Sequence, residues 1–290
     1  MPLAATSEGG QRVMPTDTGS AALLAQLSLQ RRAELATLGA CLLWGTSFVV
    51  TKNALHYSSP LVLIALRYLV ADVALLLLYG RRMAREHVPG ALLCGCLLFA
   101  GFGLQTAGLK RTTPSRSAFL TALCIPLTPL CGCLVFRRLP RAVEVLCTPL
   151  AALGIFLVTM HSDADTGRSR AAFNSGDVMT LGCALMYGFH NNALSYYNAG
   201  GKEGAFETLA VGQIGVTMVL SAVLCSAFER PFLHPTWLLF GDVLLTGLLA
   251  TTVAFTAYCW ALKHASATRV AIISSTGASL LWLASSHVHS

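Results

Sequence analysis

Long apolar blocks recur along this 290-residue chain and are separated by short polar connectors. Each block has about 17 to 25 residues, which lets a helix cross a hydrocarbon core of about 30 Å. Only 11% of the residues are charged and 54% are hydrophobic, whereas a soluble domain needs a far more charged surface. The sequence therefore predicts an all-α polytopic membrane protein. Nine spanning segments are expected, at 34–54, 59–79, 89–108, 116–136, 143–160, 177–198, 207–228, 238–262 and 269–287.

The net charge of +7 comes from short basic clusters between the apolar blocks. Such clusters are typical of topology signals, and they do not indicate a nucleic-acid surface. With the N-terminus in the cytosol, the cytosolic connectors hold twelve Lys and Arg residues and the opposite connectors hold seven. We therefore expect a cytosolic N-terminus and no nucleic-acid partner.

Ten cysteines are present, and four of them form C-x-C pairs at Cys94/Cys96 and Cys131/Cys133. Both pairs lie in apolar segments, where residues two apart on a helix point in different directions. We interpret them as small buried side chains and expect no metal site or disulfide there.

Two sequence echoes indicate an internal duplication. Residues 109, 110, 116 and 118 (Leu, Lys, Arg, Ala) recur 153 positions later as the same four residue types, and LGACLLWG at 38–45 is matched 143 positions later by LGCALMYG. Five predicted segments precede the second copy, so the second copy should enter the membrane from the opposite side. The sequence thus predicts two inverted repeats.

The domain organisation follows from this duplication. We expect a polar N-terminal tail at 1–33, a first repeat of five helices at 34–160, an inter-repeat loop at 161–176 and a second repeat of four helices at 177–290.

Several stretches, taken in order, resemble the EamA type of the drug/metabolite transporter superfamily. They are LLWGTSFVVTKNAL, SPLVLIALRYLVA and LQTAGLKRTTPSRSAFLTAL in the first half, and GDVMTLGCALMYGFHN and TTVAFTAYCWALKHASATRVAII in the second. The resemblance covers residues 34–287 and implies ten helices in two inverted five-helix units, with transport of small metabolites through a central cavity and no bound cofactor. The family's tenth helix has no counterpart after STGASLLWLASSHVHS. We therefore expect about nine helices, with the second repeat lacking its last one.

Arg67 lies near the middle of the segment at 59–79. A charge at that depth costs at least about 2.5–3.5 kcal/mol on insertion scales, so the side chain should face protein or a wet cavity. It either contacts an anionic group of a substrate or anchors on backbone carbonyls, and the sequence leaves both alternatives open.

Tyr187, His190 and Asn191 are spaced i, i+3 and i+4 and form one polar face in an apolar segment. The 143-residue separation places this face opposite Trp44, Ser47 and Phe48, and the 153-residue separation relates Gln105 to Tyr258. Polar side chains at such related positions suit a cavity between the repeats, although hydrogen bonds between helices are the alternative. His190 could carry protons or be a neutral hydrogen-bonding group. The predicted cavity residues are Trp44, Ser47, Arg67, Gln105, Tyr187, His190, Asn191 and Tyr258.

These features predict a secondary transporter that moves small polar metabolites by alternating access. The alternatives are a sugar-phosphate or nucleotide-sugar carrier of the same superfamily, for which more basic residues than Arg67 would be expected, and a non-transporting receptor or assembly protein. An enzyme is not expected, because the chain has no H-E-x-x-H, no G-x-S-x-G and no paired intramembrane carboxylates. The expected partners are a small-molecule substrate and the lipid bilayer, with a homodimer left open.

Overall fold

The computed structural model describes residues 18–137, 173–198 and 202–264, together with the single positions 149, 153 and 273. Within these ranges every regular element is a helix, and one isolated antiparallel bridge joins Ser58 to Leu233. The predicted segments at 143–160 and 269–287, and most of the predicted loop at 161–176, lie outside the described residues.

The described helices follow the predicted segments closely. They are α1 (Thr18–Ala54), α2 (Pro60–Tyr79), η1 (Gly80–Arg82), η2 (Arg85–His87), α3 (Val88–Leu109), α4 (Pro114–Ala122), α5 (Cys124–Phe136), α7 (Ser175–Asn198), α8 (Ala205–Phe228), α9 (Trp237–Leu244), η3 (Leu245–Val253) and α10 (Ala254–His264). Helix α1 begins well before the predicted start at residue 34, because residues 18–33 are rich in the helix formers Ala, Leu, Gln and Arg.

Six helical stretches of the described chain are long and apolar enough to cross a membrane. They are Leu27–Ala54, Pro60–Arg82, Arg85–Leu109, Pro114–Val135, Ala205–Phe228 and Trp237–Ala261. Helix α7 corresponds to the segment predicted at 177–198 but is more polar than these six, because it carries Asp177, His190 and three asparagines. The chain is thus a multi-pass membrane protein, as predicted.

Proline lies at the start of α2 and α4 and inside α5. Pro60 and Pro114 occupy the first turns of α2 and α4, where a missing N–H costs nothing. The predicted helix at 116–136 is divided at Leu123 into α4 and α5, just before Pro126 and with Pro129 inside α5. Proline removes a backbone donor and clashes with the preceding turn, which explains the division of this helix.

Element η3 is a π-helical segment between α9 and α10. Two threonine hydroxyls close its wide turns: Thr251 donates to the Thr246 carbonyl at 2.9 Å, and Thr252 donates to the Gly247 carbonyl at 3.1 Å. Both bonds join residues five apart. A π-helical turn accommodates an additional residue, and such turns are frequent at functional sites.

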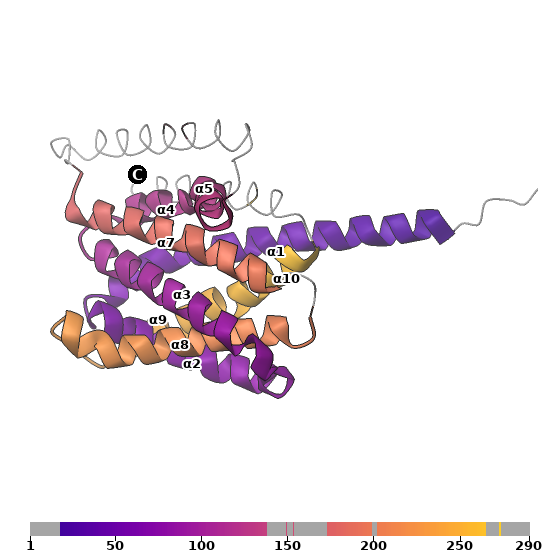
Figure 1. Ribbon diagram of the computed structural model, residues 1–290. Helices are drawn as coiled ribbons and strands as arrows, with labels where there is room; N and C mark the ends of the chain where they lie inside the picture. Colours follow the sequence, from indigo (N-terminus) through magenta and orange to yellow (C-terminus); the bar gives the residue numbers. More distant parts are fainter. Residues whose placement is uncertain are drawn as a thin grey trace, which may run out of the picture.

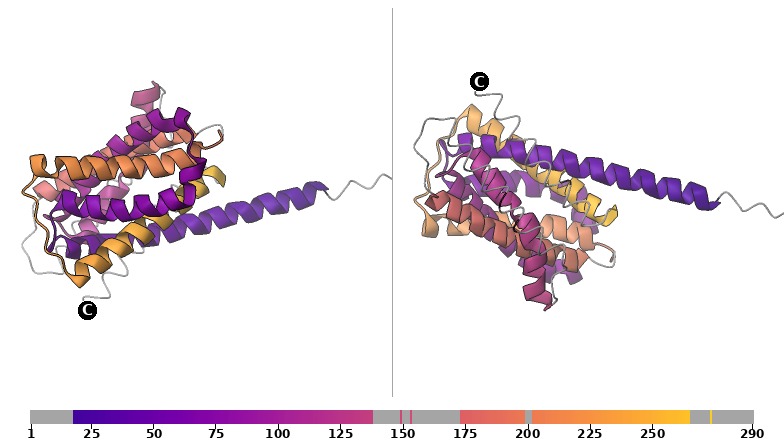
Figure 2. Two further views of the ribbon diagram at one scale, coloured as in Figure 1. Left: turned by 90° about the horizontal axis from the view of Figure 1, so that it is seen from below. Right: turned by 90° about the horizontal axis from the view of Figure 1, so that it is seen from above.

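The helices form one bundle, with α1 extending beyond it toward the N-terminus (Figures 1 and 2). Helix α3 packs on α7 and α8, α2 packs on α8 and η3, α1 packs on α10, and α5 packs on α7. The largest buried cluster joins α2, α3 and α8 and includes Ile64, Tyr68, Leu98 and Ile214. These contacts bring both predicted halves of the chain together in the interior.

Candidate functional site

Arg67 lies inside the bundle and is only 4% exposed. Its Nε and Nη2 atoms donate to the Thr251 hydroxyl of η3 at 3.3 and 3.0 Å. The guanidinium carbon lies 5.2 Å from the ring centre of Phe102 and 5.5 Å from that of Tyr68. Over the described ranges Arg67 forms no ion pair, and its hydrogen bonds go to a side-chain hydroxyl and not to backbone carbonyls.

Two aromatic rings flank this guanidinium, and a third ring, that of Tyr187, packs against one of them. The rings of Tyr68 and Phe102 are 5.3 Å apart and those of Phe102 and Tyr187 are 5.5 Å apart, both in edge-to-face geometry. Both tyrosines lie within electrostatic range of Arg67. Their hydroxyls are buried and make no hydrogen bond to any described residue, although the Cys183 thiol, a weak acceptor, lies beside Tyr187. We call Arg67, Tyr68, Phe102 and Tyr187 the Arg67 cluster.

The remaining residues of the α7 polar face bind two different helices. The Nε2 atom of His190, which is 3% exposed, lies 2.7 Å from the Gln213 side-chain oxygen of α8. Asn191 donates from Nδ2 to the Thr128 hydroxyl of α5 at 3.2 Å. Both side chains therefore join α7 to its neighbours in this conformation.

Trp44 and Tyr258 meet near the π-helical segment. The Trp44 indole donates from Nε1 to the Ala250 carbonyl at 2.8 Å, and its ring lies 5.1 Å from that of Tyr258 and 5.7 Å from that of Phe255. The Phe255 ring also lies 6.4 Å from His190, so this aromatic group reaches α7.

The last two predicted residues make more local contacts. Ser47 donates its hydroxyl proton to the Trp44 carbonyl of its own helix at 2.5 Å. Gln105 donates to the Thr121 hydroxyl of α4 at 3.1 Å. The structure thus brings Arg67 together with Tyr187, and Trp44 together with Tyr258, but it does not place all eight predicted residues in direct contact.

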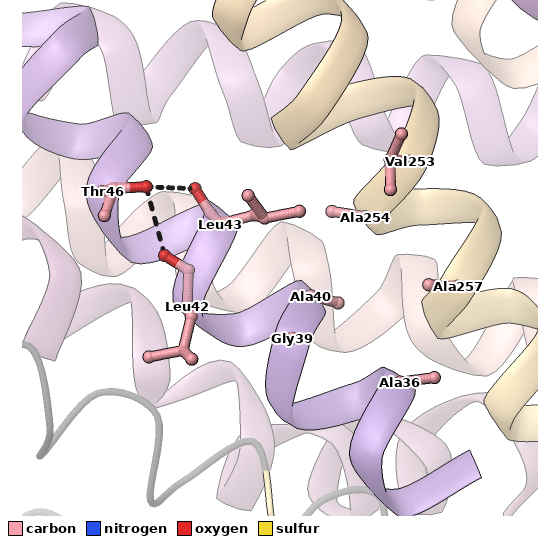
Figure 3. Close-up of a pocket in the computed structure, with 9 residues that line it drawn as sticks. All are labelled: Ala36, Gly39, Ala40, Leu42, Leu43, Thr46, Val253, Ala254 and Ala257. Atoms are coloured by element: carbon pink, nitrogen blue, oxygen red, sulfur yellow. Dashed lines mark hydrogen bonds between the residues drawn. The ribbon is translucent and has the colours of Figure 1, made fainter. Parts of the chain in front are cut away.

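An apolar hollow of about 490 Å³ lies between α1 and the η3–α10 helix (Figure 3). It is lined by Ala36, Gly39, Ala40, Leu42, Leu43, Thr46, Val253, Ala254 and Ala257, none of which was predicted as a cavity residue. The Thr46 hydroxyl donates to the Leu42 and Leu43 carbonyls of its own helix. With this hydroxyl already bonded, the hollow offers little to a polar solute.

A buried ion pair joins the start of α4 to the start of α7. The Asp177 side chain is 0% exposed, and its carboxylate accepts from Arg116 Nη2 at 2.8 Å, from the Thr112 hydroxyl at 2.7 Å and from the Asn174 backbone N–H at 3.0 Å. Charge-assisted bonds of this length are among the strongest available to side chains. They hold two helices from different halves of the chain together at one end of the bundle.

Lys52, near the end of α1, closes the same end of the bundle. Its Nζ atom donates to the carbonyls of Leu109, Lys110 and Thr112 at 2.5, 3.2 and 2.9 Å. A cation at the C-terminus of a helix satisfies orphan carbonyls and complements the helix dipole. Lys52 therefore ties α1 to the end of α3.

No group of three metal-ligating side chains gathers among the residues that the structure places, and the cysteines placed there form no disulfide with one another.

Residues 31–160 match the EamA-like transporter family. Over 241 residues the chain is 26% identical to an uncharacterized transporter of Archaeoglobus fulgidus, an alignment that covers 83% of this chain and 73% of the relative. Residues 31–160 of this chain are thus an EamA-like transporter domain. Over 232 residues it is 25% identical to the uncharacterized inner membrane transporter YedA of Escherichia coli strain K12, covering 78% of this chain and 72% of that protein. A crystal structure with 19% identity shares the fold, with a TM-score of 0.67 over 87% of each chain.

This EamA-like transporter is therefore an integral multi-pass membrane protein with a transport role. Three of its interior contacts were not predicted from sequence: Tyr68 and Thr251 beside Arg67, and Gln213 beside His190. Gln213 had a signal, because it is a polar residue inside the apolar segment at 207–228. Thr251 had none, because a threonine in a membrane helix usually bonds its own backbone.

Proposed function

We propose that this EamA-like transporter carries a small polar metabolite by alternating access between two inverted repeats, at 34–160 and 177–290. The single observation that best supports the proposal is a set of contacts that occurs twice, with the two halves of the chain exchanged. Such an exchange is what a pseudo-two-fold axis in the membrane plane produces.

The aromatic contacts are one such pair. The rings of Trp44 and Phe255 lie 5.7 Å apart at 67°, and those of Tyr187 and Phe102 lie 5.5 Å apart at 66°. Trp44 precedes Tyr187 by 143 residues, and Phe102 precedes Phe255 by 153. These separations are the ones that relate the two sequence echoes, so equivalent residues make equivalent contacts.

Close helix contacts at two glycines repeat in the same way. A methyl group added to Gly95 would overlap the Val216 side chain and crowd the Gln213 carbonyl, and one added to Gly247 would crowd Val70 and overlap the Arg67 carbonyl. A separation of 146 residues relates Arg67 to Gln213, and it also relates Val70 to Val216.

The two glycines are 152 residues apart, one fewer than the 153 of the two phenylalanines. Gly247 lies inside the π-helical segment Leu245–Val253 and Phe255 lies after it. The additional residue of a π-helical turn accounts for the difference, which strengthens the correspondence between the two halves.

The helix packing is consistent with the same exchange. The contact of α3 with α7 corresponds to that of α10 with α1, and α2 and α8, which are counterparts, pack on each other. Five predicted helices per repeat make the second repeat enter from the opposite side. The two repeats can then exchange conformations to give inward-open and outward-open states.

One end of the bundle is closed here by Asp177 with Arg116. By the same separations these two residues correspond to Glu34 and Arg269, of which Arg269 lies outside the described residues. If the two repeats are inverted, Glu34 and Arg269 would form an ion pair at the opposite end of the bundle. We propose that these two ion pairs form alternately. With a cytosolic N-terminus, the end of the bundle that is closed here is the non-cytosolic end.

A double-cysteine variant tests this mechanism. Cysteines at Arg111 and Ser175, whose native side chains are joined by a 3.3 Å hydrogen bond, allow the closed end to be locked with a short thiol cross-linker. Purified protein in vesicles loaded with a cell metabolite extract should release particular solutes, identified by mass spectrometry. The cross-link should stop release, and reductive cleavage of a disulfide-containing linker should restore it. Unchanged release from fully cross-linked protein would refute alternating access through this end.

A further inference from the structure

Three hydrogen-bond donors in the Arg67 cluster lack a strong acceptor. Arg67 carries a buried positive charge with no carboxylate partner among the placed residues, and its Nη1 atom makes no hydrogen bond to any of them. The Tyr68 and Tyr187 hydroxyls are buried. Tyr68 has no acceptor among the placed residues, and Tyr187 has only the weakly accepting Cys183 thiol beside it. Tyr68 itself is 0% exposed.

This arrangement is costly for a folded protein. A buried hydroxyl without a partner costs about 1–3 kcal/mol, and an unpaired buried charge costs more. All three groups can donate, and the guanidinium can only donate. The three groups lie within electrostatic range of one another, so an anion that enters this space can accept hydrogen bonds from them.

The surroundings fix the guanidinium and leave it available. The Thr251 hydroxyl accepts from Nε and Nη2 of Arg67 and donates its own proton to the Thr246 carbonyl. It is therefore fully used in positioning Arg67. The carboxylate nearest along α2, Asp72, lies instead against Gly215 of α8 and is not an electrostatic partner of Arg67.

We propose that Arg67, Tyr68 and Tyr187 together bind the carboxylate group of a small organic monoanion, the solute that this transporter carries. One positive charge matches one negative charge, whereas a phosphate dianion would leave a buried charge without compensation. The Phe102 ring, 5.2 Å from the guanidinium, supplies an apolar wall for the body of the solute. The inference rests on the proposed alternating access, because both hydroxyls are buried here and the solute must reach them in another conformation.

Calorimetric titration of the purified full-length protein in lipid nanodiscs tests the site. The probes are benzoate, its neutral counterpart benzamide, and inorganic phosphate. Benzoate is expected to bind more tightly than either of the others. Tyr68→Phe and Tyr187→Phe should each weaken benzoate binding about ten- to a hundredfold, the effect of losing one hydrogen bond to a charged group. Arg67→Lys, which keeps the charge but loses the planar fork, should also bind more weakly.

Tyr79→Phe is the matched control, since it removes a hydroxyl from the same helix outside the Arg67 cluster, and its benzoate affinity should be unchanged.

A measurement of stability distinguishes a binding role of the Tyr68 hydroxyl from a structural one. The Tyr68 hydroxyl has no partner in the ligand-free protein, so Tyr68→Phe should leave the unfolding temperature unchanged or raise it. A lowered unfolding temperature without benzoate would assign the hydroxyl a structural role and overturn the proposal.

The other outcomes are equally decisive. Equal affinity for benzoate and benzamide, or tighter binding of phosphate, would refute the carboxylate site. Solute exchange in vesicles that persists at the wild-type rate in Tyr68→Phe and Tyr187→Phe would refute the site and leave the transport proposal standing. Benzoate binding that depends on both hydroxyls, in a protein that exchanges no solute, would refute transport and keep the site.

Discussion

Replacing Asp177 with Asn should open the end of the bundle at which α4 and α7 begin. The carboxylate is fully buried and accepts three hydrogen bonds, including the one from Arg116 at 2.8 Å. Asparagine keeps the shape but removes the negative charge beside a 7%-exposed arginine. Removing one partner of a buried ion pair costs about 3–5 kcal/mol, or about a hundredfold or more in an equilibrium constant.

That loss should appear in two measurements. The free energy of unfolding, followed by titration with a denaturing detergent, should fall by up to about 3–5 kcal/mol. A cysteine at Ser175, in a background without native cysteines, should react faster with a membrane-impermeant thiol reagent, because the open form at this end becomes more populated. Transport should slow, since one of the two alternating states is disfavoured.

Glu86→Gln is the matched control. Glu86 pairs with His87 at 3.0 Å, but its side chain is 69% exposed. An exposed pair contributes at most about 1 kcal/mol, so this change should have little effect. If Asp177→Asn leaves both stability and labelling rate at the wild-type values, the reasoning about this ion pair is wrong.

Three further contacts can be tested by substitution. Gly101→Val should overlap the Tyr187 ring, separate α3 from α7 and abolish transport, whereas Gly241→Ala, which meets nothing within 4 Å, should leave transport intact. Lys52→Met should lower the free energy of unfolding by about 1–2 kcal/mol, because the C-terminal carbonyls of α3 lose a charged donor; unchanged stability would argue against the cap. Trp44→Phe should keep the ring contacts but lose the hydrogen bond to a carbonyl of η3. The free energy of unfolding should fall by about 1 kcal/mol in the same titration, and a fall of more than about 3 kcal/mol would contradict this assignment.

The sequence alone determined the class of fold and the approximate extent of most described helices. Helix existence in a membrane is a local property, since a run of about 20 apolar residues must bond its own backbone. Six of the nine predicted segments correspond to apolar helices of spanning length. A seventh, at 177–198, corresponds to the more polar helix α7. The break in the segment at 116–136 followed from Pro126 and Pro129 for an equally local reason. Interior placement of Arg67 followed from the cost of exposing a charge to lipid.

The tertiary structure decided which partners these residues meet. Arg67 meets Thr251 across 184 residues and Trp44 meets the Ala250 carbonyl across 206, contacts that no local pattern encodes. The sequence analysis gave Lys52 no role, but its ammonium group caps the end of α3. The π-helical turn could not be predicted from the hydropathy of residues 238–262, because such a turn changes the direction of side chains and not their polarity. Each of these features depends on the packing of distant helices, which fixes the geometry of the Arg67 cluster.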